Sequence, residues 1–180
     1  MTDDASVGFV DILFVLLLAF VAQVILMIPH VNPPPTVPFI ERPPHLAAEI
    51  SWPPGNTDVD VWISGPDHKP VGYSSKSSPS VNLLRDDLGS PDLDTNWEIA
   101  ITRDLKDGDY AVNVHMFRSV VSPLAVKVSI GIKRDGQAYT EILSKTVTLT
   151  VVGEEITVYQ FGLRGGALIP GSVNSVARPM

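Results

Sequence analysis

One acidic residue, Asp11, lies inside a long apolar run near the N-terminus and is the residue best placed to do chemistry. The run covers residues 7–28, and only Gly8, Asp11 and Gln23 interrupt it. As a helix these 22 residues would span about 33 Å, enough to cross a hydrocarbon core of roughly 30 Å. A carboxylate at the centre of such a helix costs about 2.5–3.5 kcal/mol on insertion scales, and less near an end.

Two roles are open for Asp11. It could be the N-cap of a helix that starts at Ile12, which would leave residues 12–28, a short span. It could instead carry a proton or another ion, because acidic groups in membrane helices commonly line ion pathways. The run is too long, and its N-terminal flank too acidic, for a typical cleavable signal, so we expect a retained span.

The stretch GFVDILFVLLLAFV, residues 8–21, resembles the membrane helix of the ExbD/TolR family and, more distantly, that of MotB. These proteins are the B subunits of ion-driven motor complexes. Phe9, Val10 and Asp11 match their aromatic, aliphatic and acidic signature, whereas Gly8 stands where the family commonly has proline. The resemblance covers roughly residues 6–30.

The resemblance implies that Asp11 carries the coupling ion, H⁺ or possibly Na⁺, with no other cofactor. It implies a homodimer through the membrane helix, enclosed by a ring of ExbB/TolQ/MotA-like A subunits. It also implies an inner-membrane, single-pass location, with the N-terminus cytoplasmic and the C-terminal domain periplasmic or extracellular. Four apolar residues follow Asp11 at helical spacing and are expected to pack near it, namely Phe14, Val15, Leu18 and Ala22.

The rest of the chain departs from that family, whose outer domains are small α/β or peptidoglycan-binding folds. Short runs of alternating apolar residues, separated by Gly, Asp and Pro turns, predict an antiparallel β-sandwich of about six to eight strands. We expect a polar tail at 1–6, a transmembrane helix at 7–28, a proline-rich stalk at 29–46, the sandwich at 47–163 and a loosely ordered tail at 164–180.

Composition and motifs exclude several functions. Twenty acidic against thirteen basic residues argue against nucleic-acid binding, and the chain contains no cysteine. No catalytic motif is present, so we expect no enzyme activity. Asp58, Asp60 and Asp67 could offer oxygen ligands to Ca²⁺, but turn-forming and solvating roles explain them as well, and no metal is expected.

A second hypothesis treats the chain as a membrane-anchored β-sandwich that binds a protein or carbohydrate ligand and transports no ion. Three tryptophans, Trp52, Trp62 and Trp97, could form a platform for a carbohydrate. In the motor hypothesis, the same domain couples motion to an external load that the sequence does not identify.

Overall fold

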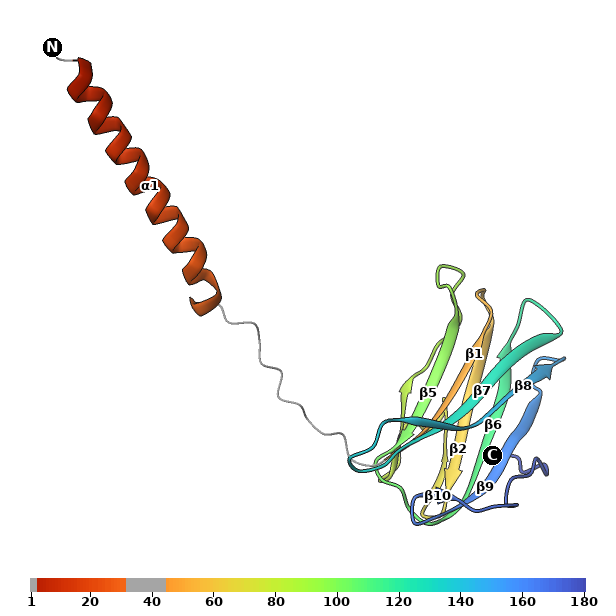
Figure 1. Ribbon diagram of the computed structural model, residues 1–180. Helices are drawn as coiled ribbons and strands as arrows, with labels where there is room; N and C mark the ends of the chain where they lie inside the picture. The colour runs from red at the N-terminus through yellow and green to blue at the C-terminus, as the bar shows by residue number, and fades with distance from the viewer. Residues whose placement is uncertain (1–2, 32–44) are drawn as a thin grey trace. The chain divides into compact units, whose positions relative to one another are not determined.

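The computed structural model describes residues 3–31 and 45–180 (Figure 1). The chain divides into two units, Met1–Glu41 and Arg42–Met180. Helix α1, Asp3–Val31, forms the described part of the first unit, and an all-β domain forms that of the second. A helix followed by an antiparallel sandwich was predicted, and that fold is confirmed. Most of the predicted stalk, 29–46, lies outside the described residues. Residues 29–31 belong to helix α1, and residues 45 and 46 belong to the first strand.

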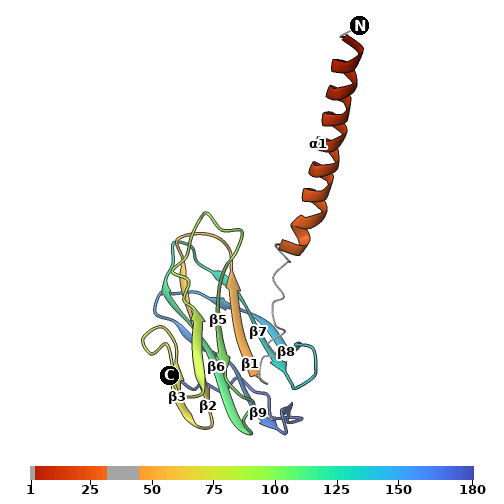
Figure 2. The same ribbon diagram turned by 90° about the vertical axis from the view of Figure 1, so that its left-hand side faces the viewer.

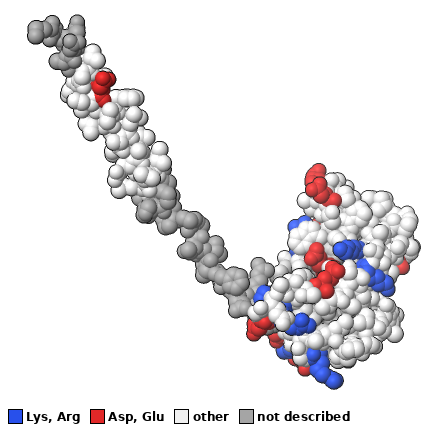
Figure 3. All heavy atoms as spheres, in the orientation of Figure 1, with Lys and Arg blue, Asp and Glu red and all other residues white. Residues whose placement is uncertain are grey.

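Between Val7 and Met27, helix α1 is apolar on all sides except at Asp11 and Gln23, and Figure 3 shows the described part of the helix free of charged side chains apart from one acidic group. Its segment Val7–Met27 is long and apolar enough to cross a membrane, and all of its side chains are exposed in the described structure. A soluble helix would bury one face against a core. The uniform apolar surface instead suits a surrounding of lipid or of other membrane helices. The predicted tail at 1–6 is shortened, because the helix already begins at Asp3.

The β domain consists of two five-stranded antiparallel sheets (Figure 1). Sheet A has the order β4-β5-β1-β7-β8, and sheet B has the order β10-β9-β6-β2-β3. The strands are β1 His45–Trp52, β2 Asp58–Gly65, β3 His68–Val71, β4 Val81–Arg85, β5 Asn96–Thr102, β6 Gly108–Arg118, β7 Leu124–Lys133, β8 Thr140–Leu149, β9 Glu155–Arg164 and β10 Ala167–Leu168. The described residues thus form more strands than predicted, because short strands such as β3 and β10 carry little periodic signal.

The core lies between the two sheets and belongs entirely to the β domain. Alternate residues of β1 face it, and Val59, Val61 and Ile63 of β2 meet them from sheet B with no exposed surface. Each fully buried aliphatic side chain of this size stabilises the fold by about 1.5–3 kcal/mol. The core cluster contains no residue of the first unit, so the domain encloses its own hydrophobic interior.

Strand register defines two ends of the sandwich. His45, where the described chain resumes after α1, pairs with Lys133, whereas Ser51 at the far end of β1 pairs with Lys127. The connections at that far end are 53–57, 86–95, 119–123 and 150–154. Figures 1 and 2 both show these loops away from the start of β1. We call this the distal end.

The C-terminal tail packs along sheet B, in contrast with the expectation of a loosely ordered segment. Asn174 and Gln160 exchange two backbone hydrogen bonds, of 2.8 and 2.9 Å. Further along, the Arg178 amide donates to Thr157 Oγ1 and the Met180 amide donates to Glu155. The prediction was wrong because backbone pairing with β9 holds the tail in place. Pairing of this kind does not require alternating apolar residues, so the sequence of the tail shows no hydrophobic period.

Candidate functional site

Asp11 lies in the interior of helix α1. The helix begins at Asp3, about two turns before Asp11, and continues without a break to Val31. An N-cap residue lies outside the first helical turn. The capping role considered for Asp11 is therefore wrong, and the carboxylate needs another explanation.

The predicted neighbours of Asp11 share its helix face. Phe14, Val15, Leu18 and Ala22 belong to the same uninterrupted helix at spacings that bring side chains together. Among the described residues, none forms a hydrogen bond or ion pair with the Asp11 carboxylate, which is exposed. A carboxylate in this position would need a partner from another chain or from water if the helix crosses a membrane.

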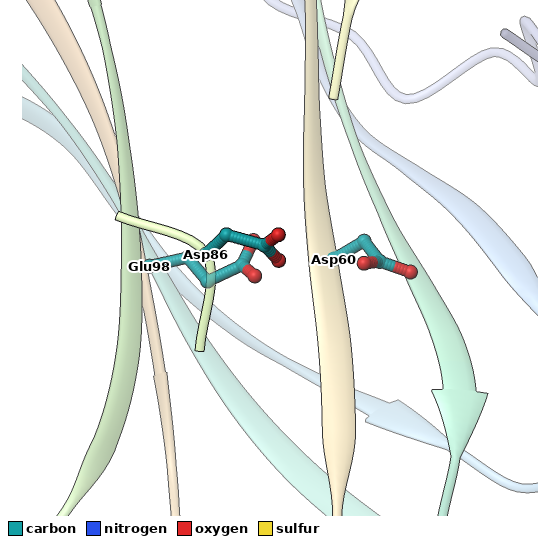
Figure 4. A group of neighbouring side chains, drawn as sticks. All are labelled: Asp60, Asp86 and Glu98. Atoms are coloured by element: carbon teal, nitrogen blue, oxygen red, sulfur yellow. The ribbon is translucent and has the colours of Figure 1, made fainter. Parts of the chain in front are cut away.

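A second group of acidic side chains lies in the β domain. Asp60 on β2, Asp86 after β4 and Glu98 on β5 each offer an oxygen, and these oxygens lie within 4.8 Å of one another. Figure 4 shows Asp86 and Glu98 extending from one side toward β2, which carries Asp60. The group therefore links β2 of sheet B with β5 and the end of β4 in sheet A.

Glu98 occupies this position because part of β2 has no neighbouring strand on one side, which leaves a backbone amide to be paired. Strand β3 pairs with β2 only from Ile63 onward, so the amide of Val61 has no strand partner on that side. Glu98, which has no exposed surface, accepts a hydrogen bond from this amide at 2.8 Å and another from the Asp87 amide at 3.1 Å. Buried backbone donors require such partners, so Glu98 completes the sheet edge.

Asp60 and Asp86 each have a basic side chain nearby, whereas Glu98 has none among the described residues. His115 Nδ1 lies 3.0 Å from Asp60, and Lys76 donates to Asp86, but no cation contacts Glu98 in the described structure. Burial raises the pKa of Glu98 to about 9, and the nearby Asp60 and Asp86 act in the same direction. Burial also raises the pKa of Asp60 to about 6. At neutral pH Glu98 therefore holds a proton.

The three candidate calcium ligands are not brought together. Asp67 lies in the turn after β2 and pairs with Lys106 at 2.8 Å, whereas Asp58 is buried with its carboxylate 3.9 Å from Arg118. Only Asp60 joins the acidic group. Ca²⁺ takes six to eight oxygen ligands. Both Glu98 oxygens already accept amide hydrogen bonds, and Asp60 and Asp86 already contact His115 and Lys76, so the group leaves fewer free oxygens than Ca²⁺ takes.

Glu98 was missing from the residues selected by sequence. Its strand, NWEIAIT, alternates so that Asn96, Glu98, Ala100 and Thr102 share the inward face, and these four residues are buried. The alternation carries no signal for this position, because it groups Trp97, Ile99 and Ile101 as the apolar face, whereas the structure turns that face outward and Glu98 inward. Burial of a lone carboxyl is costly unless it is hydrogen-bonded or protonated.

The three tryptophans do not form one platform. Trp52 lies in the core and donates to the Thr57 carbonyl, while Trp97 contacts the Arg85 guanidinium, 4.5 Å from its ring centre. Trp62 lies on the outer face of sheet B, where its ring packs 5.4 Å from that of Tyr73. The predicted platform of these three residues is therefore wrong.

A different aromatic cluster occupies the outer face of sheet B, formed by Trp62, Tyr73, His115 and Phe117. Tyr73 contacts the other three rings at centroid distances of 5.4 to 6.2 Å. Half of the Phe117 surface is exposed, and Tyr73 is 38% exposed. The cluster offers solvent an aromatic surface beside the paired Asp60 and His115.

Comparisons with protein-family models, curated proteins and solved structures return no match to this chain.

Proposed function

We propose that the chain is a B-type subunit of a proton-driven or sodium-driven membrane motor, in which Asp11 carries the ion. The observation that supports the proposal is the position of Asp11 in the interior of an apolar helix, where it caps nothing and contacts no described cation. Intramembrane carboxylates in such positions typically serve ion pathways. No enzyme activity is proposed.

The proposed assembly follows from the cost of exposing this carboxylate to lipid. Two copies of α1 would pair inside a ring of ExbB/TolQ/MotA-like A subunits in the inner membrane. Asp11 would be neutral against apolar ring residues and ionised where water reaches it, and each ion transfer would bias the next step. With the N-terminus cytoplasmic, the β domain would lie outside and couple this motion to an external load.

Substitution of Asp11 by Asn tests the proposal. Asn has nearly the same size and forms hydrogen bonds, but it cannot titrate. We expect the Asp11→Asn complex to assemble while ion flux falls to background, and Asp11→Glu to retain part of the flux. Flux is measured in vesicles that contain the chain co-purified with its A-type partner.

Gln23→Leu provides the control, since it alters the other polar side chain of the span without removing a titratable group. It should leave most of the flux intact. Full flux in the Asp11→Asn variant would contradict the motor proposal.

A second candidate function is that of a membrane-anchored binding module. The exposed aromatic cluster favours it, because aromatic rings supply most of the contact energy in many recognition surfaces. This candidate predicts that Tyr73→Ala and Phe117→Ala abolish capture of a protein or polysaccharide ligand, while Asp11→Asn changes nothing. The two candidates therefore give opposite results with the same set of variants.

A further inference from the structure

Exposed apolar side chains gather on the distal end of the sandwich. The distal patch consists of Leu88, Phe117, Val120, Val121, Val151 and Val152, each at least half exposed. Single exposed apolar residues are ordinary, but a group of this size on neighbouring loops indicates an interaction surface.

Hydrogen bonds join the loops that carry this patch. The Gly153 amide donates to the Met116 carbonyl at 2.8 Å, and the Ser122 hydroxyl donates to the Thr150 carbonyl. Arg118 donates to the Leu88 carbonyl at 2.7 Å. The loops at 86–90, 117–123 and 150–154 therefore present one continuous surface.

The backbone of these loop tips is largely satisfied from within. The Glu154 carboxylate accepts hydrogen bonds from the Thr150 and Val151 amides, and the Glu154 amide donates to the Val151 carbonyl at 3.1 Å. Ser119 Oγ accepts from the Val121 amide at 3.1 Å. Unpaired backbone groups are costly in lipid, so paired tips with aliphatic side chains suit contact with a bilayer.

The composition of the distal end favours lipid over a protein partner. Its exposed apolar residues are mainly valines, whereas protein interfaces concentrate their binding energy in Trp, Tyr and Arg. The distal loops carry Asp86, Asp87, Asp92, Asp94 and Glu154 and no Lys or Arg. The cations beside them include Arg118, at the end of β6, and Lys76 and Arg85, which pair with Asp86 and Asp87. This acidic excess disfavours anionic headgroups, so the lipid surface that fits is a neutral one.

We propose that the distal patch inserts shallowly into a neutral lipid bilayer. The proposal does not require ion transport by Asp11.

The first test uses the β domain alone, residues 42–180, because its core contains no residue of the first unit. We expect the domain to float with phosphatidylcholine vesicles, and phosphatidylglycerol to weaken the binding. The double variant Val120→Asp, Val151→Asp should bind at least tenfold less. Val176→Asp is the matched control, since Val176 and Val120 are each 67% exposed and Val176 lies on the C-terminal tail.

Circular dichroism and a thermal melt establish that each variant is folded. A wild-type domain that stays in the soluble fraction would overturn the proposal and leave a protein partner as the occupant. Equal flotation of the double variant and the wild type would also overturn it.

The second test locates the patch in lipid. Because the chain has no cysteine, Val152→Cys provides a single site for an environment-sensitive fluorophore in the full-length protein. After reconstitution into proteoliposomes, a lipid-borne quencher present both in the protein's own bilayer and in added protein-free vesicles should lower the fluorescence. Unchanged fluorescence under these conditions would overturn the proposal. The Asp11→Asn variant should give the same quenching as wild type, so the result does not depend on the motor proposal.

Discussion

Glu98 replaces, with one side chain, the neighbouring strand that β2 lacks at Val61. Its two carboxyl oxygens accept amide hydrogen bonds from β2 and from the loop after β4, and the residue has no exposed surface. The local sequence could not predict this role, because the missing strand partner arises from the short pairing between β2 and β3. Asp11 is the opposite case: its place within a helix followed from the apolar run around it.

Removing the Glu98 side chain should destabilise the β domain strongly. Glu98→Ala leaves the buried amides of Val61 and Asp87 without partners, and each loss costs about 1–3 kcal/mol. We expect the free energy of unfolding to fall by about 2–4 kcal/mol in urea titrations of residues 42–180. Glu141→Ala, at an exposed position on β8, should change it by less than about 0.5 kcal/mol. Equal stability of the two variants would show that Glu98 does not support the sheet edge.

At the scale of elements, the C-terminal tail acts as an additional partner for the outer surface of β9. It donates to Thr157 through Arg178, and the Arg178 carbonyl accepts a hydrogen bond from Asn113, which has no exposed surface. Alternating runs predicted the main strands, whereas this irregular segment has no period. Its order depends on hydrogen bonds to residues far away in sequence, which the sequence pattern does not reveal.

Truncation of the tail should lower stability without changing the fold. Deletion of residues 173–180 removes the Arg178 carbonyl, one of the two acceptors of Asn113 Nδ2, and the backbone pairing of Gln160, so we expect a loss of about 1–3 kcal/mol. The measurement is urea unfolding of the β domain, with far-ultraviolet circular dichroism to follow strand content. Val176→Asp keeps every backbone hydrogen bond of the tail and serves as the control. An unchanged unfolding midpoint after truncation would contradict the stabilising role.

At the scale of the whole molecule, the apolar helix and the sandwich could be predicted because each has a clear hydrophobic period. The order of strands within each sheet could not, since it depends on which strands meet across the core. The three tryptophans lie on different faces of the sandwich for the same reason. Trp52, Trp62 and Trp97 lie on strands facing the core, the outside of sheet B and the outside of sheet A, respectively. One sequence cannot assign those faces before the sheets are assembled.

The buried carboxyls should also set the pH dependence of the entire β domain. Glu98, with a pKa raised by burial to about 9, and Asp60, with a pKa raised by burial to about 6, hold their protons more tightly in the folded state than in the unfolded chain. Their ordinary values are 4.5 and 3.8. These two groups therefore stabilise the fold most at low pH. The contribution of Asp60 is lost as pH rises from 3.8 to about 6, and that of Glu98 is lost as pH rises from 4.5 to about 9. Glu154, whose pKa is lowered by the Thr150 amide, acts in the opposite sense and loses its contribution only under more acidic conditions.

We therefore expect the β domain to melt at a lower temperature at pH 9 than at pH 5, by about 5–10 °C. Differential scanning calorimetry of residues 42–180 across this range provides the measurement. Glu98→Gln cannot titrate, and its amide nitrogen cannot accept one of the two backbone hydrogen bonds. This variant should consequently be less stable than wild type at pH 5, yet show a flatter decline toward pH 9. A melting temperature that rises from pH 5 to pH 9 in the wild type, or an equally steep decline in Glu98→Gln, would show that the proton on Glu98 does not stabilise the fold.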